Sequence, residues 1–210
     1  MKVLLVNGSP HEKGCTYTAL DQAAGPLRQA GIETEFFWLG TAPISGCRGC
    51  RVCATLRRCA IDDAVNAFTD LAADCDGFLF GSPVHYAGIS GEMKSFMDRA
   101  FLSSGRKEVN PFALKPAGAL VSARRAGTTA ALDQLNKYLL HSQMLVPGSR
   151  YWNMVHGNTP EEVLQDAEGL QIMRVLGRNL AWLLQLKAAG AAAGVPLPLQ
   201  EARIDTNFIR

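Results

Sequence analysis

The sequence has almost no net charge. It contains 21 Lys and Arg residues against 19 Asp and Glu residues, which leaves a formal charge of +2 over 210 residues. Proteins that bind nucleic acid or an anionic membrane through charge carry a larger basic excess. We therefore expect neither nucleic acid nor a membrane as a partner.

Long apolar runs are missing as well. No uninterrupted apolar stretch approaches the ~20 residues that a membrane-spanning helix requires. The apolar run at residues 3–6 is far too short for the core of a signal peptide. We therefore expect a cytoplasmic protein.

Two familiar phosphate-binding motifs are absent from the loop after the first apolar run. Residues 7–17 match neither G-x-x-x-x-G-K-[ST] nor G-x-G-x-x-G. The first motif binds nucleoside triphosphates, and the second binds dinucleotides. The loop therefore argues against both of these ligand classes.

What the sequence does contain is a repeated alternation of apolar strands and helices. Strands are predicted at residues 2–6, 33–39, 77–80, 116–122 and 149–155, and helices at residues 16–30, 63–73, 91–102, 127–141 and 160–188. This alternation predicts an α/β fold, with a doubly wound five-stranded parallel sheet and helices on both faces. Ligands of such sheets bind at the carboxyl ends of the strands.

The chain is predicted to form one domain over residues 1–190, with a cysteine-rich loop at residues 47–59 inserted in it. Residues 191–210 are predicted to be a linker and a C-terminal arm, because this segment is rich in Ala, Gly and Pro. Phe208 and Ile209 suit docking on a neighbouring subunit. The alternative is a frayed terminus.

The loop at residues 7–17 joins a strand to the start of a helix. The first N–H groups of a helix lack internal partners and carry partial positive charge. A phosphate binds well at such a position. Ser9 and Thr16 offer hydroxyl groups, and His11 adds charge. The alternative is an ordinary capped helix start.

This loop resembles that of the NAD(P)H-dependent FMN reductase branch of the flavodoxin-like proteins. The family loop reads Gly-Ser-Pro-Arg followed by Gly-Asn-Thr, and here His11 stands at the Arg position and Cys15 at the Asn position. The resemblance implies a flavodoxin-like fold that binds FMN. The residues implied for its phosphate are Ser9, His11, Gly14, Cys15 and Thr16.

The second loop, at residues 81–91, resembles the family's Gly-Ser-Pro-Val-Tyr loop and the Ser-Gly-x-x-Lys helix start behind it. The resemblance implies that this loop lies along the flavin ring. Backbone amides there would stabilise the negative charge that builds up on reduction, and Tyr86 offers a face for stacking. The implied residues are Pro83, Val84, His85, Tyr86 and Gly88. The alternative is a plain strand-to-helix turn.

The third loop, at residues 122–129, matches the family more loosely. The family uses the corresponding loop as the other wall of the flavin site, which implicates Ser122 and Gly127. Arg124 and Arg125 would contact flavin, a nicotinamide phosphate or only water. The sequence has no separate nicotinamide motif, so it does not settle the electron donor.

Four of the six cysteines lie in the segment 47–59, with the spacing C-x2-C-x2-C-x5-C. Closely spaced cysteines on a tight loop can supply thiolates to a cubane iron–sulfur cluster. Zinc, disulfides and an empty cysteine frame are the alternatives. The segment also contains four arginines, which would lower the pKa of nearby thiols or form a solvated basic face.

The spacing also resembles the compact motif of archaeal-type iron–sulfur flavoproteins, which belong to the same superfamily. The position before the third strand and the acidic pair Asp62-Asp63 match as well, and the likeness extends over about residues 1–130. The resemblance implies a [4Fe–4S] cluster. Its implied ligands are Cys47, Cys50, Cys53 and Cys59.

Together, these features predict an FMN-dependent redox protein with a [4Fe–4S] cluster. It would transfer electrons from a reduced donor, NAD(P)H or a ferredoxin-type protein, to a small acceptor or protein partner. One alternative is a cluster-free NAD(P)H-dependent FMN or quinone reductase, and the other is a non-catalytic redox carrier or sensor. The family resemblance implies a homodimer or homotetramer. No residue is assigned a catalytic role.

Overall fold

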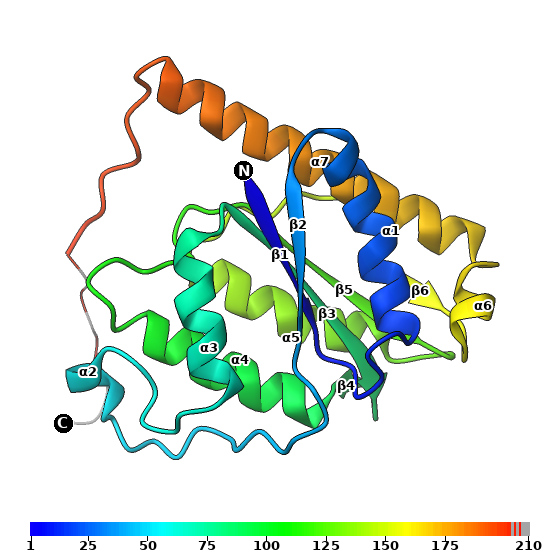
Figure 1. Ribbon diagram of the computed structural model, residues 1–210, viewed down its shortest axis with the longest axis horizontal. Helices are drawn as coiled ribbons and strands as arrows, with labels where there is room; N and C mark the ends of the chain where they lie inside the picture. Colours follow the sequence, from blue (N-terminus) through cyan, green and yellow to red (C-terminus); the bar gives the residue numbers. More distant parts are fainter. Residues whose placement is uncertain (203, 205, 207–210) are drawn as a thin grey trace.

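The protein forms one six-stranded sheet (Figure 1). The structure is a computed structural model, which describes residues 1–202, 204 and 206. Five strands are parallel and lie side by side in the order β2-β1-β3-β5-β6. They are β1 (Lys2–Asn7), β2 (Glu33–Trp38), β3 (Gly77–His85), β5 (Ala117–Ala123) and β6 (Met154–His156). The chain direction across the sheet reverses between β1 and β3, so the predicted doubly wound α/β fold is confirmed.

The sixth strand, β4 (Gly88–Ile89), forms because β3 ends later than the sequence predicts. The sequence predicts an end at residue 80, before Gly-Ser-Pro. In the structure β3 continues to His85, because β5 stays paired with it as far as Pro83 opposite Ser122. Val84 then pairs with Ile89 in an antiparallel hairpin. The predicted count of five is correct for the parallel strands and one short for the whole sheet.

Helices cover both faces of the sheet, as predicted. One face is covered by α1 (Cys15–Gln29) and α7 (Ala167–Ala192), and the other by α3 (Ala64–Leu71), α4 (Gly91–Ser104) and α5 (Thr128–His141). Shorter elements are α2 (Cys53–Leu56), the 3-10 turn η1 (Ala72–Asp74) and α6 (Pro160–Val163). Within the described residues, no helix is both long and apolar enough to cross a membrane.

Strand β1 shows why the sheet is buried on both faces. Val3 and Leu5 belong to the core shared with α1 and α7, whereas Leu4 and Val6 belong to the core shared with α3, α4 and α5. All of these side chains are fully buried. Because side chains alternate between the two faces of a strand, a continuous apolar run fits a strand that is covered on both sides.

The C-terminal segment differs from the prediction in two places. The helical pattern at residues 160–188 is interrupted after α6, because Asp166 caps a new helix by accepting a hydrogen bond from the Gly169 amide at 2.9 Å. Helix α7 then continues to Ala192, past the predicted helix end at residue 188. Residues 195–202 are exposed. The suggested docking residues Phe208 and Ile209 lie outside the described residues.

Candidate functional site

Loops at the carboxyl ends of β1, β3 and β5 lie together at one edge of the sheet (Figure 1). We call this meeting place the crevice, after the position at which such sheets bind ligands. The Gly8 amide donates a hydrogen bond to the Gly81 carbonyl, and the Ser90 hydroxyl donates one to the Gly8 carbonyl, both at 2.8 Å. The buried hydroxyl oxygens of Thr16 and Ser122 lie 2.8 Å apart, which ties the start of α1 to the end of β5. The structure therefore brings the three loops singled out by the sequence to one place.

The start of helix α1 is open to an anion. Gly14 is its N-cap residue, and no side chain in the described part of the chain caps it. A β-carbon at Gly14 would lie 2.9 Å from the Cβ of His11, so the loop is wound tightly. The Ser9 hydroxyl supports this loop by accepting a hydrogen bond from the His11 amide at 3.1 Å. The first N–H groups of α1 therefore present partial positive charge to the crevice, as a phosphate site requires.

A strained hairpin forms the second wall of the crevice. Tyr86 and Ala87 link β3 to β4, and both have positive φ angles, +48° and +59°. Such strain persists only where the surroundings hold it. Gln134 of α5 holds this hairpin, because its Oε1 accepts a hydrogen bond from the Ile89 amide at 3.1 Å. The Tyr86 side chain is fully exposed, so its ring is available to a ligand.

Gly127 allows the third loop to approach the hairpin closely. Its φ angle is +92°, in the left-handed region that favours glycine. A β-carbon there would lie only 2.7 Å from the Cα of Ala87. Arg124 and Arg125, three and two residues earlier, have exposed side chains. The close approach of loop and hairpin therefore depends on glycine at this position.

The residues predicted to bind flavin fall into three levels of exposure. The buried ones are Ser9, Thr16 and Ser122. The half-buried ones are Gly14, Cys15, Pro83, Val84, Gly88 and Gly127. The exposed ones are His11, His85 and Tyr86. The structure places all of them on the three loops that meet, and their contacts with a cofactor stay a prediction.

Cys15 has a partner in the loop that follows β6. Its thiol donates a weak hydrogen bond to the Gly157 carbonyl at 3.7 Å. Burial raises the pKa of this thiol above its ordinary value. Cys15 therefore stays protonated at neutral pH and adds no negative charge beside a bound phosphate.

The four clustered cysteines line a single pocket. It has a volume of about 250 Å³ and lies between the loop at residues 47–59 and helix α4. Cys47 and Cys50 are exposed, Cys59 is half-buried, and Cys53 is buried at the first residue of α2. The structure therefore brings the predicted ligand set to one place.

The thiols of this pocket do not converge on one point. Among the described residues, no three His, Cys, Asp or Glu side chains lie close enough together to hold a metal ion. The donor chemistry nevertheless fits an iron–sulfur cluster, which is bound by four thiolates. The chain also coils tightly between the cysteines, because Gly49, Arg51 and Arg57 have φ angles of +65°, +58° and +58°.

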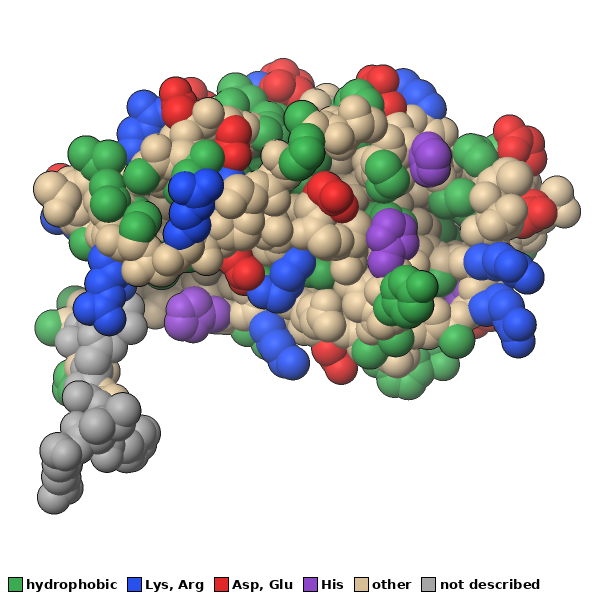
Figure 2. All heavy atoms as spheres, turned by 90° about the horizontal axis from the view of Figure 1, so that it is seen from below, with side chains coloured by type: hydrophobic (Ala, Val, Ile, Leu, Met, Phe, Trp, Pro, Cys, Tyr) green, Lys and Arg blue, Asp and Glu red, His purple; other side chains and the backbone are tan. Residues whose placement is uncertain are grey.

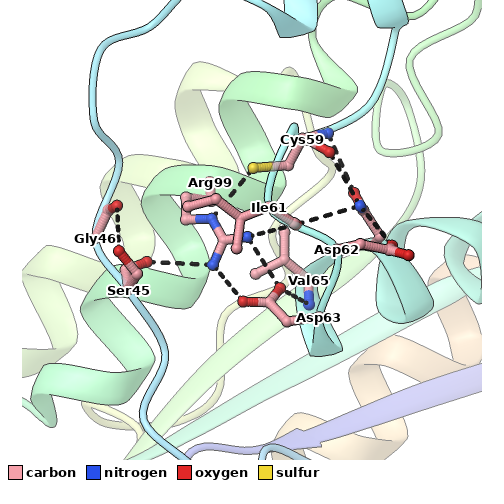
Figure 3. A network of polar contacts seen from close by, with 9 residues as sticks. Ser45, Gly46, Cys59, Ile61, Asp62, Asp63, Val65 and Arg99 are labelled. Carbon is pink, nitrogen blue, oxygen red and sulfur yellow. Dashed lines mark hydrogen bonds and ion pairs between the residues drawn. The ribbon is translucent and has the colours of Figure 1, made fainter.

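Arg99 of α4 lines this pocket and is a buried charge (Figure 3). Only 2% of the residue is exposed. Its guanidinium forms a two-bonded ion pair with Asp63, at 2.6 and 2.9 Å, and its Nε donates to the Cys59 Sγ at 3.2 Å. Other N–H groups donate to the carbonyls of Ser45 and Ile61. One side chain therefore contacts both ends of the cysteine loop.

Asn66 of α3 holds Cys59 from the other side. Its Nδ2 donates to the Cys59 carbonyl at 3.0 Å, and its Oδ1 accepts from the Cys59 amide at 3.1 Å. Neither Arg99 nor Asn66 is among the site residues that the sequence predicts. One signal was available: Arg99 lies three residues after the buried Phe96, on the buried face of a helix. A buried arginine requires a partner.

The carboxyl-end face of the sheet has mixed charge. The strands run towards the lower edge of Figure 1, and Figure 2 views the molecule from below. Lys and Arg side chains are interspersed there with Asp and Glu, and the coloured residues form no broad field of one sign (Figure 2). This mixture agrees with the small net charge of +2.

Comparison with known sequences identifies relatives of this chain. Residues 1–159 match the family described as NADPH-dependent FMN reductase. An iron–sulfur flavoprotein of Methanocaldococcus jannaschii is 32% identical over 194 residues, which cover 89% of this chain and 98% of that protein. An iron–sulfur flavoprotein of Archaeoglobus fulgidus is 27% identical over 190 residues, which cover 86% and 95%.

Solved structures share the fold at low sequence identity. RosB, solved with a bound 8-demethyl-8-formylriboflavin-5'-phosphate intermediate, superposes with a TM-score of 0.71 at 15% identity, covering 100% of this chain and 93% of that one. FerB, an NAD(P)H:acceptor oxidoreductase of Paracoccus denitrificans, gives a TM-score of 0.62 at 14% identity, covering 88% and 97%. An archaeal flavodoxin gives 0.59 at 14% identity, covering 88% and 99%. These likenesses confirm the predicted flavodoxin-like architecture.

Proposed function

The chain belongs to the NADPH-dependent FMN reductase family and is a flavin-dependent oxidoreductase; from this premise we propose that it transfers electrons through FMN and a [4Fe–4S] cluster. The electrons would pass between a reduced donor and a small acceptor or protein partner. One observation carries the proposal: the four cysteines of a C-x2-C-x2-C-x5-C segment line one pocket beside α4.

The crevice residues fit FMN. The uncapped start of α1, with the hydroxyls of Ser9 and Thr16, would hold the phosphate. The hairpin around Tyr86 and the loop at Gly127 would hold the ring. Bound there, the flavin supplies chemistry that exchanges a hydride or single electrons. The protein's own part is to supply backbone dipoles and to fix the geometry.

The cysteine pocket fits an iron–sulfur cluster in its donor chemistry. Cys47, Cys50, Cys53 and Cys59 would be the ligands, and a cluster held by them supplies one-electron exchange. Two of these residues are anchored, Cys53 by burial and Cys59 by Asn66 and Arg99. The other two are exposed, so they are available to close on a metal. The full-length relatives named iron–sulfur flavoproteins support this reading.

Helix α4 connects the two regions. Its N-cap residue Ser90 donates to the Gly8 carbonyl in the crevice, and Arg99 on the same helix contacts Cys59 in the pocket. Nine residues of helix span about 14 Å. One rigid element would therefore hold both redox groups at a fixed separation within the chain.

The proposal extends to partners and assembly. NAD(P)H or a ferredoxin-type protein would be the electron donor, and a small molecule or a protein the acceptor. The protein would work in the cytoplasm as a homodimer or homotetramer, without nucleic acid or membrane. The mixed charge of the face in Figure 2 supports the absence of a polyanionic partner.

The test compares wild-type protein with the Cys50→Ala variant, both purified without oxygen. FMN, iron and acid-labile sulfide are measured in each. Cys50 is exposed, so its replacement should leave the fold and the FMN content unchanged while iron and sulfide are lost. Iron that survives in Cys50→Ala, or a wild-type protein with FMN and no iron, would contradict the proposal.

One observation favours a second candidate, the cluster-free NAD(P)H-dependent FMN or quinone reductase. The thiols do not converge, and Cys47 and Cys50 are exposed to solvent. This candidate predicts rapid NAD(P)H oxidation by protein that contains FMN and no iron, with the same rate in Cys50→Ala. A redox sensor, in contrast, would turn over slowly and change shape when these thiols are oxidised.

A further inference from the structure

Every N–H group of the Arg99 guanidinium has a hydrogen-bond partner, as its burial requires. Its guanidinium donates five hydrogen bonds: two to Asp63, one each to the carbonyls of Ser45 and Ile61, and one to the Cys59 sulfur. A guanidinium has five N–H donors in a fixed fork. No other side-chain type could make this set of contacts.

These contacts close the cysteine loop at both ends. The Nη1 group donates to Ser45 O at 3.2 Å, two residues before Cys47, and Nη2 donates to Ile61 O at 2.8 Å, two residues after Cys59. Figure 3 shows Ser45 and Cys59 on opposite sides of the guanidinium. Because Arg99 stands on helix α4, one side chain fastens both ends of the loop to this helix.

The charge of Arg99 is balanced without the sulfur. Asp63 accepts two of its N–H groups, and the same carboxylate caps helix α3 by accepting a hydrogen bond from the Val65 amide at 3.0 Å. A buried arginine is stable when paired in this way. The bond from Nε to Cys59 is therefore additional to the ion pair.

We propose that Arg99 is the positioning residue of the cysteine pocket: it holds the Cys59 sulfur for the cluster and raises the cluster's reduction potential. The inference rests on the proposed function, since it requires the cysteines to bind iron. Hydrogen bonds to ligand sulfur, and nearby positive charge, stabilise the more negative reduced cluster. Arg99 provides both at a single ligand.

The test uses the holoprotein and three variants. Arg99→Lys keeps the charge and the pairing with Asp63 but cannot reach sulfur and both carbonyls together. The double variant Arg99→Met/Asp63→Asn removes both charges, so that no unpaired charge stays buried. Lys94→Met is the matched control, because it breaks the ion pair of Lys94 with Asp98 on the same helix without touching a cysteine.

Iron affinity, FMN content, far-UV circular dichroism and the potential of the cluster are measured in each protein. Arg99→Lys and the double variant should bind iron about 10- to 100-fold more weakly. The cluster that remains should be reduced only at a lower potential than in wild type. FMN content and helical signal should stay unchanged, and Lys94→Met should match wild type in all four measurements.

The outcomes separate this inference from the proposed function. If the wild-type protein contains no iron, the proposed function itself is wrong. A wild-type cluster whose potential and affinity persist in Arg99→Lys and in the double variant overturns the role of Arg99 alone. If both variants lose FMN and helical signal together with iron, Arg99 is a brace of the fold and the positioning role is rejected.

Discussion

The crevice and the cysteine pocket lie along helix α4 but are built in different ways. The crevice consists of loops that directly continue paired strands, and its walls are tied by Ser90, by the Thr16–Ser122 hydroxyl pair and by Gln134. The pocket lies under the loop at residues 47–59. In the described part of the chain, Cys59 is the only one of its four cysteines that has hydrogen bonds to other helices, from Arg99 and Asn66.

The difference indicates when each site forms. The crevice is shaped by the sheet and should exist before a cofactor arrives, which lowers the entropic cost of binding. The pocket has two anchored and two exposed cysteines, so its final shape depends on the metal. Metal binding commonly supplies folding free energy to such loops. The two sites should therefore respond separately to mutation.

The largest expected effect comes from Cys59→Ala. This change removes the anchored ligand, and the variant should contain no cluster while keeping its FMN. Cys75→Ala is the control, since Cys75 is a free cysteine of the same domain that lies outside the pocket. Its iron content should equal that of wild type. A cluster in Cys59→Ala would show that the ligand set is misassigned.

The second-largest effect is expected in the crevice, where a substitution should weaken FMN binding without changing the cysteine pocket. In Gly127→Ala the new β-carbon would meet Ala87 at 2.7 Å, in a backbone conformation with φ of +92°. Strain of this kind amounts to about 1–3 kcal/mol, so FMN affinity, measured by fluorescence titration, should fall about 5- to 150-fold. Gly148→Ala is the control, because nothing lies within 4 Å of its β-carbon. Equal affinities in both variants would contradict the account of the third loop.

The third prediction concerns the hydroxyl that joins α4 to the crevice. In Ser90→Ala the cap on Met93 N and the bond to Gly8 O are both lost. The free energy of unfolding in urea should fall by about 1–2 kcal/mol. Ser104→Ala on the same helix should not lower it, since the Ser104 hydroxyl is buried with no partner among the described residues, and burying an unpartnered hydroxyl costs free energy. An equal loss of unfolding free energy in the two variants would show that the hydrogen bonds of the Ser90 hydroxyl do not stabilise the fold.

The smallest effect lies between the two regions, where the Tyr138 hydroxyl donates to Asp98 of α4. Burial, and then this hydrogen bond, raise the pKa of Tyr138 above its ordinary value of 10.0. A group whose pKa is raised by folding stabilises the fold while protonated, so the contribution is complete below pH 10 and is lost as the pH rises through the raised value. Tyr138→Phe should therefore be less stable than wild type by about 1 kcal/mol at pH 8. In urea titrations, the difference in the free energy of unfolding between the two proteins should narrow above pH 10. A difference independent of pH would contradict a stabilising role for the protonated Tyr138 hydroxyl.

The sequence predicted well those features that depend on neighbours along the chain. The run Val3–Val6 indicated a strand covered on both faces, and the structure buries all of it. The crevice loops follow the strand ends, so their meeting point followed from the fold class. The segment 47–59 was identified from its spacing alone, and its cysteines do line one pocket.

The differences come from contacts between distant residues. Strand β3 continues through Pro83 because β5 lies beside it, and this pairing joins residues far apart in the chain. The bond of Arg99 to Cys59 spans 40 residues, so no local pattern announces it. The break between α6 and α7 does have a local signal, since Asp166 is a residue type that favours the N-cap position and lies inside the predicted helix.

A reductive titration without oxygen decides whether one chain holds both FMN and an iron–sulfur cluster. Dithionite is added in steps while the flavin absorption and the broad visible absorption of the cluster are followed together with the electrons consumed per FMN. We expect the protein to take up one more electron per FMN than flavin alone accepts, and both absorptions to bleach. Uptake that ends at the flavin's own electron count, with no absorption beyond that of flavin, would contradict it.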